Sequence, residues 1–133
     1  MSQLQISTGA VKLDIIRDGE NVGVFKFNPR DIGEAQRYGK VVAEMESKKV
    51  DYLKTAVELD ESDDVGSKID FLAEYVGDLR KDIDKIYGEG TSQLVFGNAL
   101  NIDMFFDFLS SLAPYYKQAS SERTAKYKNK ASK

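Results

Sequence analysis

The stretch that decides the fold runs from Tyr87 to Asn101 and reads YGEGTSQLVFGNALN. A heptad-patterned helix precedes it and an aromatic-rich helix follows it, so the stretch connects two helices. Gly88 is placed to end the first helix in the left-handed conformation, and Gly90 is placed to form a turn. Thr91 is expected to cap a single helical turn that Gly97 ends. The stretch contains no recognisable set of catalytic side chains, so it is predicted to connect and to bind.

The flanking helices are predicted from their caps and their apolar spacing. Ser67 and Asp70 form a capping-box-like start to the preceding helix. Its apolar residues recur at spacings of three and four: Ile69, Leu72, Val76, Leu79, Ile83 and Ile86. Asn101 is the expected cap of the following helix. That helix carries a dense apolar and aromatic stripe: Ile102, Phe105, Phe106, Leu109, Leu112 and Tyr116. Pro114 lies inside this pattern and predicts a kink or a break near Ser110.

A long first helix is predicted to run from the Asn28-Pro29 pair to about Leu59. Asn28 is the expected N-cap and Pro29 suits the first helical position, while Phe27 is placed to pack against Ile32. Apolar residues then recur at helical spacing. The short link to the next helix indicates an antiparallel helical pair.

Two β-prone runs, Val11–Arg17 and Val22–Phe27, precede this helix. The DGEN sequence between them suits a chain reversal, so the runs predict a β-hairpin. A two-residue loop would pair Leu13 with Val24, whereas a three-residue loop would pair Leu13 with Phe25, and the pattern leaves both registers open. An isolated hairpin is marginally stable in water. Its apolar face must therefore lie on the helices, or its edge must pair with a strand of another chain.

Together these patterns predict an α+β fold that is mostly α. An N-terminal β-hairpin is followed by three main helices, of which two form a long antiparallel pair and the third is C-terminal and aromatic-rich. The length of 133 residues lies in the usual range for one domain. Residues 1–118 are predicted to form that domain, and residues 119–133 are predicted to be a basic, frayed tail.

The Tyr87–Asn101 stretch resembles a run found in small tail assembly chaperones of long-tailed, siphovirus-type phages and prophages of Gram-positive bacteria. The resemblance extends more loosely to the hairpin and to Phe27-Asn28-Pro29. It implies that the chain binds the tape measure protein and recruits major tail tube subunits in the cytoplasm of the bacterial host, and is not retained in the virion. It also implies that the motif residues mark a structural turn and no catalytic site: Gly88, Glu89, Gly90, Thr91, Phe96 and Gly97.

Composition argues against most catalytic chemistry. The chain has no cysteine and no histidine, so thiol nucleophiles, imidazole bases and the usual zinc ligands are absent. Gly88 and Gly90 lack the lysine of a phosphate-binding loop. The acidic run Asp60–Asp64 lacks the glycine and the closing glutamate of a calcium loop. We expect no enzyme, cofactor or metal site, and with no apolar run of about 18 residues we expect no membrane span.

Charge is unevenly distributed. Residues 117–133 carry six Lys or Arg against one acid, a net charge of +5, whereas the first 116 residues carry a net charge of −8. The basic side chains could meet nucleic acid or an acidic partner, or they could simply complement the negative end of a helix. The latter interpretation is favoured. The candidate basic residues at the end of the chain are Lys126, Lys128, Lys130 and Lys133.

The large aromatic side chains of the helix after Asn101 are too numerous to lie on one face. Most could belong to the core, or some could form a surface for self-association or client binding. The candidate partner-binding residues are Phe25, Phe27, Phe105, Phe106, Leu109 and Tyr116. A tail assembly chaperone is the first functional hypothesis. The alternatives are a structural tail or connector subunit and a small binding module that uses the basic terminus.

Overall fold

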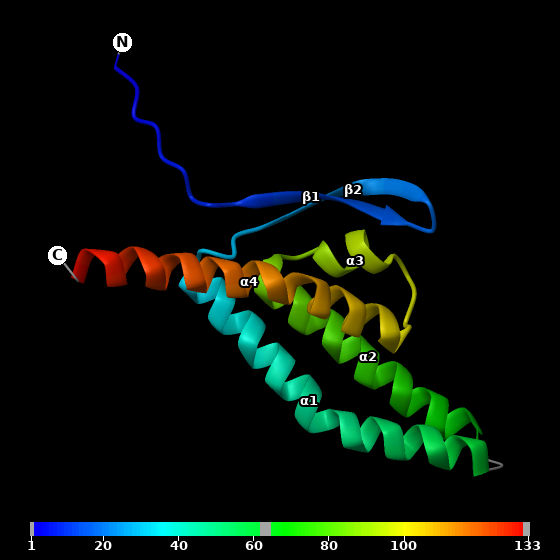
Figure 1. Ribbon diagram of the computed structural model, residues 1–133. Helices are drawn as coiled ribbons and strands as arrows, with labels where there is room; N and C mark the ends of the chain where they lie inside the picture. The colour runs from blue at the N-terminus through cyan, green and yellow to red at the C-terminus, as the bar shows by residue number, and fades with distance from the viewer. Residues whose placement is uncertain (1, 62–64, 132–133) are drawn as a thin grey trace.

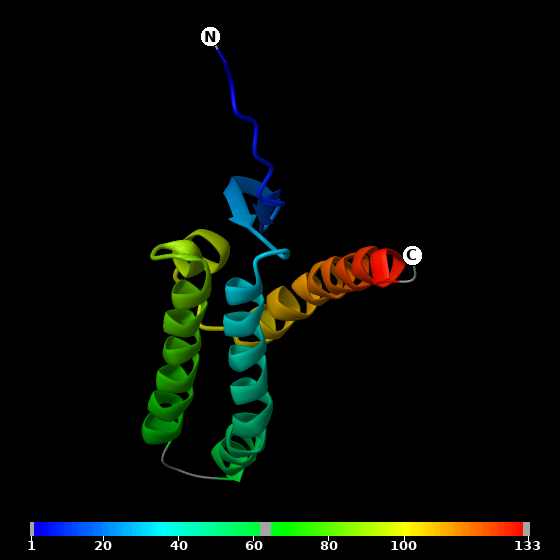
Figure 2. The ribbon, with the colours of Figure 1, turned by 90° about the vertical axis from the view of Figure 1, so that its left-hand side faces the viewer.

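The computed structural model describes residues 2–61 and 65–131, with side chains described for residues 2–58 and 66–128. The elements are β1 (Val11–Arg17), β2 (Glu20–Phe27), α1 (Ile32–Glu61), α2 (Val65–Tyr87), α3 (Thr91–Phe96) and α4 (Ile102–Ala131). Helices α1 and α2 run side by side, α4 crosses them, and the hairpin lies over one end of the pair (Figures 1 and 2). The predicted α+β, mostly α architecture is confirmed.

The hairpin combines features of both predicted registers. Its turn is the two-residue Asp18-Gly19 loop, yet Leu13 pairs with Phe25, as expected for a longer loop. A bulge next to Ile15 resolves the conflict, because it inserts an extra residue on β2 between the turn and the paired strands. Gly23, with a φ of 149°, lies opposite Ile15 at this irregularity.

Helix α1 begins later than predicted. The side chain of Asp31, not Asn28, caps it, since Asp31 Oδ1 accepts a hydrogen bond from the backbone N–H of Glu34 at 3.1 Å. Asn28 instead closes a tight turn, in which its carbonyl accepts from Asp31 N–H. The predicted contact of Phe27 with Ile32 is also wrong. Ile32 is 66% exposed, whereas the side chain of Phe27 is buried between the hairpin and the helices.

The core lies where α4 meets the helical pair and the hairpin. On α2 the predicted apolar seam is buried from Val76 onward, whereas Ile69 is 47% exposed. On α1 the buried apolar positions among the described side chains are Val41 and Met45. One core cluster joins α1, α2, α3 and α4, and a second joins the hairpin to Leu112 of α4.

Two other boundaries differ from the predictions. Helix α2 begins at Val65, so Ser67 lies inside its first turn. The acidic run is partly helical, since α1 extends through Asp60 to Glu61, and residues 62–64 lie outside the described residues.

Helix α4 is continuous through Pro114, so of the predicted kink or break near Ser110 the break is wrong. Proline removes one backbone hydrogen bond from a helix, but buried side chains anchor α4 on both sides of it. Leu112 is 2% exposed and Ala119 is 6% exposed. In the segment expected to be a frayed tail from residue 119, α4 continues to Ala131.

Candidate protein-binding site

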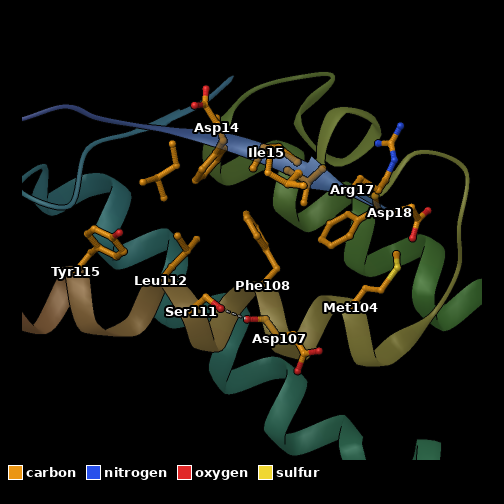
Figure 3. A pocket seen from close by; sticks show the side chains of 15 residues that line it. Asp14, Ile15, Arg17, Asp18, Met104, Asp107, Phe108, Ser111, Leu112 and Tyr115 are labelled. Carbon is orange, nitrogen blue, oxygen red and sulfur yellow. Dashed lines mark hydrogen bonds between the residues drawn. The ribbon is translucent and has the colours of Figure 1, made fainter. Parts of the chain in front are cut away.

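A long groove separates β1 from α4 (Figure 3). Its volume is about 610 Å³, and most of its lining is apolar. Alternation along β1 turns Leu13 and Ile15 toward α4, while helical spacing turns Phe108, Leu112 and Tyr115 upward from α4. We call this space the hairpin groove.

The hairpin is buried along β2 and open along β1. Phe25 and Phe27 on β2 are each 2% exposed and stack on one another with ring centroids 5.1 Å apart. Leu13 and Ile15 on β1 are only half-buried. The hairpin groove therefore opens on the side of β1.

The motif around α3 fixes one end of the groove. Arg17 at the end of β1 donates through Nη1 to the carbonyl oxygen of Leu94 at 2.8 Å. Its guanidinium lies against Gly97, where an added Cβ would come within 3.1 Å of Arg17 Cζ. Phe96 is buried and stacks on Phe105 of α4 with centroids 4.1 Å apart. These contacts attach α3 to both the hairpin and α4.

The glycines of the motif have positive φ angles of 114° at Gly88, 92° at Gly90 and 63° at Gly97. Gly90, not Thr91, is the N-cap of α3, and a glycine has no side chain that could cap the helix. The capping acceptor comes from α2 instead, since Asp84 Oδ1 accepts from Ser92 N–H at 2.8 Å. The motif is thus a structural connection in which α2 holds the start of α3.

A buried polar network joins the base of the hairpin to the helices. Glu34 on α1 accepts hydrogen bonds from the backbone N–H of Asn28 at 2.9 and 3.0 Å and from the hydroxyl of Tyr116 at 3.0 Å. The hydroxyls of Tyr116 and Tyr87 lie 2.7 Å apart. Burial raises the pKa of Glu34 and is opposed by these hydrogen bonds. Burial also raises the pKa of Tyr87 and Tyr116, so both phenols remain neutral and donate.

Most of the candidate partner-binding residues are buried. Phe25, Phe27, Phe105 and Leu109 are at most 3% exposed, so they belong to the core. Two more are half-buried, Phe106 and Tyr116. The ammonium of Lys49 lies 5.8 Å from the Phe106 ring centre, and Tyr116 belongs to the polar network.

Exposed apolar side chains occur elsewhere, at the far end of the helical pair. Val50, Leu53 and Val57 on α1 are 70%, 51% and 58% exposed. Their spacing of three and four places them on one face of the helix. We call these three residues the distal stripe. Ile69 and Phe71 on α2 are also exposed at this end. The sequence already indicated an exposed apolar surface on this helix, because α1 has more apolar residues than one packing face can bury.

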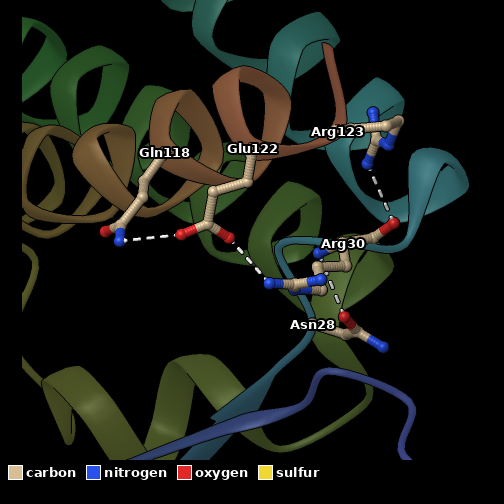
Figure 4. Close-up of polar contacts among 5 residues, drawn as sticks. All are labelled: Asn28, Arg30, Gln118, Glu122 and Arg123. Carbon is tan, nitrogen blue, oxygen red and sulfur yellow. Dashed lines mark hydrogen bonds and ion pairs between the residues drawn. The ribbon is translucent and has the colours of Figure 1, made fainter. Parts of the chain in front are cut away.

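The basic end of α4 contacts the connection between β2 and α1 (Figure 4). Arg30 Nη2 lies 2.7 Å from Glu122 Oε2, and Arg123 donates to the carbonyl oxygen of Arg30 at 3.1 Å. Of the predicted basic residues, Lys126 and Lys128 are exposed on α4. Lys130 lies in α4 without a described side chain, and Lys133 lies outside the described residues.

Within residues 2–58 and 66–128, no group of three or more carboxylates, histidines or cysteines is placed to hold a metal ion. Among the helices that the structure describes, none is long and apolar enough to cross a membrane. In the described part of the chain, the hairpin groove and the distal stripe are the apolar surfaces that we consider for binding.

Comparison with known proteins gives one match. The model of a family of unknown function, DUF6673, matches residues 20–133, from the start of β2 to the end of the chain. No curated protein and no solved structure matches the chain.

Proposed function

The chain thus belongs to a family of unknown function, DUF6673, and from its surfaces and its motif we propose that it is a phage tail assembly chaperone. It binds the tape measure protein, recruits major tail tube subunits during tail morphogenesis in the bacterial cytoplasm, and leaves before the virion is complete. The activity is binding, and no catalytic step is required.

The distal stripe is the observation that carries this proposal. Three apolar side chains on one face of α1 are each more than half exposed. The stripe lies on a part of the helical pair that extends beyond the hairpin and α4 (Figure 2). Amphipathic helices are recognised through apolar anchors at such spacings. The resemblance implies a client, the tape measure protein, that is long and rich in helices. One of those helices would pack along the distal stripe.

The Tyr87–Asn101 motif supports the same proposal in a different way. The glycines of the motif, together with Asp84 of α2, hold α3 between the hairpin and α4. The motif therefore has a structural role, and the exposed face of α1 stays free for the client. We therefore assign the partner-binding role to α1, whereas the sequence offered residues of the hairpin and of the aromatic helix.

Co-expression with the tape measure protein of the same phage or prophage tests the proposal. The wild-type chain should keep that client soluble and co-purify with it. Val50→Asp combined with Val57→Asp should abolish co-purification without changing the melting temperature, because both side chains are exposed. Ser121→Asp combined with Thr124→Asp adds the same charge to exposed positions of α4 and should co-purify as wild type does.

Two outcomes would contradict the proposal. If the wild-type chain neither solubilises the client nor binds it, the chaperone assignment is wrong. If the protein is found in purified virions at stoichiometric levels, it is a structural tail or connector subunit instead. A third outcome would move the site, since equal binding by the stripe variant and the control would exclude the distal stripe.

A further inference from the structure

The outer edge of β1 has no strand partner. Among the described residues the sheet has two strands, β1 and β2. Leu94 of α3 packs against β2, since a Cβ added at Gly23 would lie 2.6 Å from Leu94 Cδ1. The outer edge of β1 therefore presents unpaired backbone N–H and C=O groups, which can template another strand.

This free edge borders the hairpin groove. Beneath it lie the half-buried side chains of Leu13 and Ile15 from β1 and of Phe108 and Tyr115 from α4. A third strand beside β1 would hydrogen-bond to the edge and lay every second side chain over these residues. Strand addition gains affinity from the backbone and specificity from such alternate side chains. The occupant should be extended and uncharged, with apolar residues two apart.

Residues 2–10 have this character. They contain no charged side chain, and Leu4 and Ile6, two positions apart, are 86% and 76% exposed. Residues two apart lie on the same face of a strand. The segment projects from the body as an extended arm (Figures 1 and 2). Six residues, 2–7, span about 20 Å as a strand, which matches the seven-residue β1.

The arm is held away from the groove of its own chain. Asn28 Nδ2 donates to the carbonyl oxygen of Thr8 at 2.8 Å. At Gly9, φ is +86° and an added Cβ would lie 2.5 Å from Arg30 Cδ, so the backbone is pressed against that side chain. Arg30 is in turn paired with Glu122. These contacts direct residues 2–7 past the end of β2 and away from the groove of their own chain, where a second copy can receive them.

We propose that residues 2–7 of one copy bind as a third strand along β1 of a second copy, with Leu4 and Ile6 filling its hairpin groove. Exchange in both directions gives a two-fold symmetric dimer, in which each copy supplies an arm and receives one. The dimer leaves the distal stripe of both copies free. It does not depend on the identity of the client.

Light scattering with size-exclusion chromatography tests the exchange. The wild-type chain should elute at twice its chain mass. Leu4→Asp combined with Ile6→Asp should raise the dimer dissociation constant by at least about 100-fold, because each buried Leu or Ile contributes more than a factor of ten. Gln3→Asp combined with Gln5→Asp makes the same charge change on the opposite face of the arm and should remain dimeric. A monomeric wild type, or equal behaviour of the two variants, would overturn the proposal.

A disulfide trap locates the contact, since the chain has no cysteine of its own. Ser111 lines the groove on α4, so mixed copies carrying Ile6→Cys and Ser111→Cys should cross-link at twice the chain mass on oxidation. Copies carrying Ile6→Cys and Val57→Cys should not form this mixed product. A chain carrying both Ile6→Cys and Ser111→Cys should give a cross-linked dimer. If that chain closes a disulfide at the monomer mass, the arm folds back on its own groove and the exchange is refuted.

Discussion

Phe105→Ala distinguishes core packing from partner binding in the aromatic helix. Phe105 is fully buried and stacks on Phe96 with centroids 4.1 Å apart and an interplanar angle of 24°. Truncation of a buried phenylalanine to alanine costs about 3–5 kcal/mol, because transfer free energy is lost and a cavity remains. The free energy of unfolding should fall by this amount.

The corresponding change in melting temperature follows from chain length. An unfolding entropy of about 2.1 cal/mol/K per residue over 133 residues gives about 0.28 kcal/mol/K. Phe105→Ala should therefore lower the melting temperature by about 10–18 °C, measured by circular dichroism or calorimetry.

Phe106→Ala is the matched control, since Phe106 is the next residue and is only half-buried. It should cost about 1–2 kcal/mol, or roughly 4–7 °C, because part of its ring already contacts water. Equal losses at the two positions would refute the burial argument. So would a Phe105→Ala chain that melts within about 3 °C of wild type and fails to bind the client.

Four further substitutions test other parts of the scaffold. Burial raises the pKa of Glu34 above its usual 4.5, so the folded chain takes up a proton more readily than the unfolded one. As the pH falls from above this raised pKa to 4.5, proton uptake by Glu34 should increase the free energy of unfolding. Glu34→Gln should remove this increase, as measured by urea titrations across the same pH range. Asp84→Ala should cost about 1 kcal/mol by removing the acceptor for Ser92 N–H, and a thermal melt that matches wild type would contradict the capping role. Gly97→Ala should destabilise by about 1–3 kcal/mol because its φ is positive, whereas Gly39→Ala, inside α1 with open space around the new methyl, should stabilise by about 0.5–1 kcal/mol. Thermal melts that rank these two variants in the opposite order would exclude backbone strain at Gly97.

Local patterns predicted the elements well, because they depend on neighbours in the sequence. Alternation over Val11–Arg17 gave β1 its exact bounds. Asn101 caps α4 as expected, with its Oδ1 accepting from the backbone N–H of Asp103 at 3.0 Å. Gly97 ends α3, as the motif indicated.

Caps supplied by distant residues could not be predicted in this way. Thr91 suited the cap of α3 by residue type, but the acceptor is Asp84, which lies on the preceding helix. Pro114 should break a helix by local rules. Burial of α4 on either side of it outweighs the lost hydrogen bond, and that packing exists only in the folded chain.

The burial of four candidate binding residues could not be predicted for a related reason. An aromatic stripe looks the same in sequence whether it faces a core or a partner. Phe105 is covered because α3 returns across α4 and brings Phe96 onto its ring. Val57 is exposed because the antiparallel pair extends beyond the helix that could have covered it.

The hydrogen bonds that close the core join segments far apart in the chain. Tyr38 donates to the carbonyl oxygen of Leu109 across 71 positions, and Tyr116 donates to Glu34 across 82. Contacts of such long sequence separation form late in folding, because chain closure must precede them. On the ribosome, the nascent hairpin and α1 must therefore wait for α4 to be synthesised before either is secured. The molecule therefore becomes competent to assemble only after α4 has emerged and made these contacts.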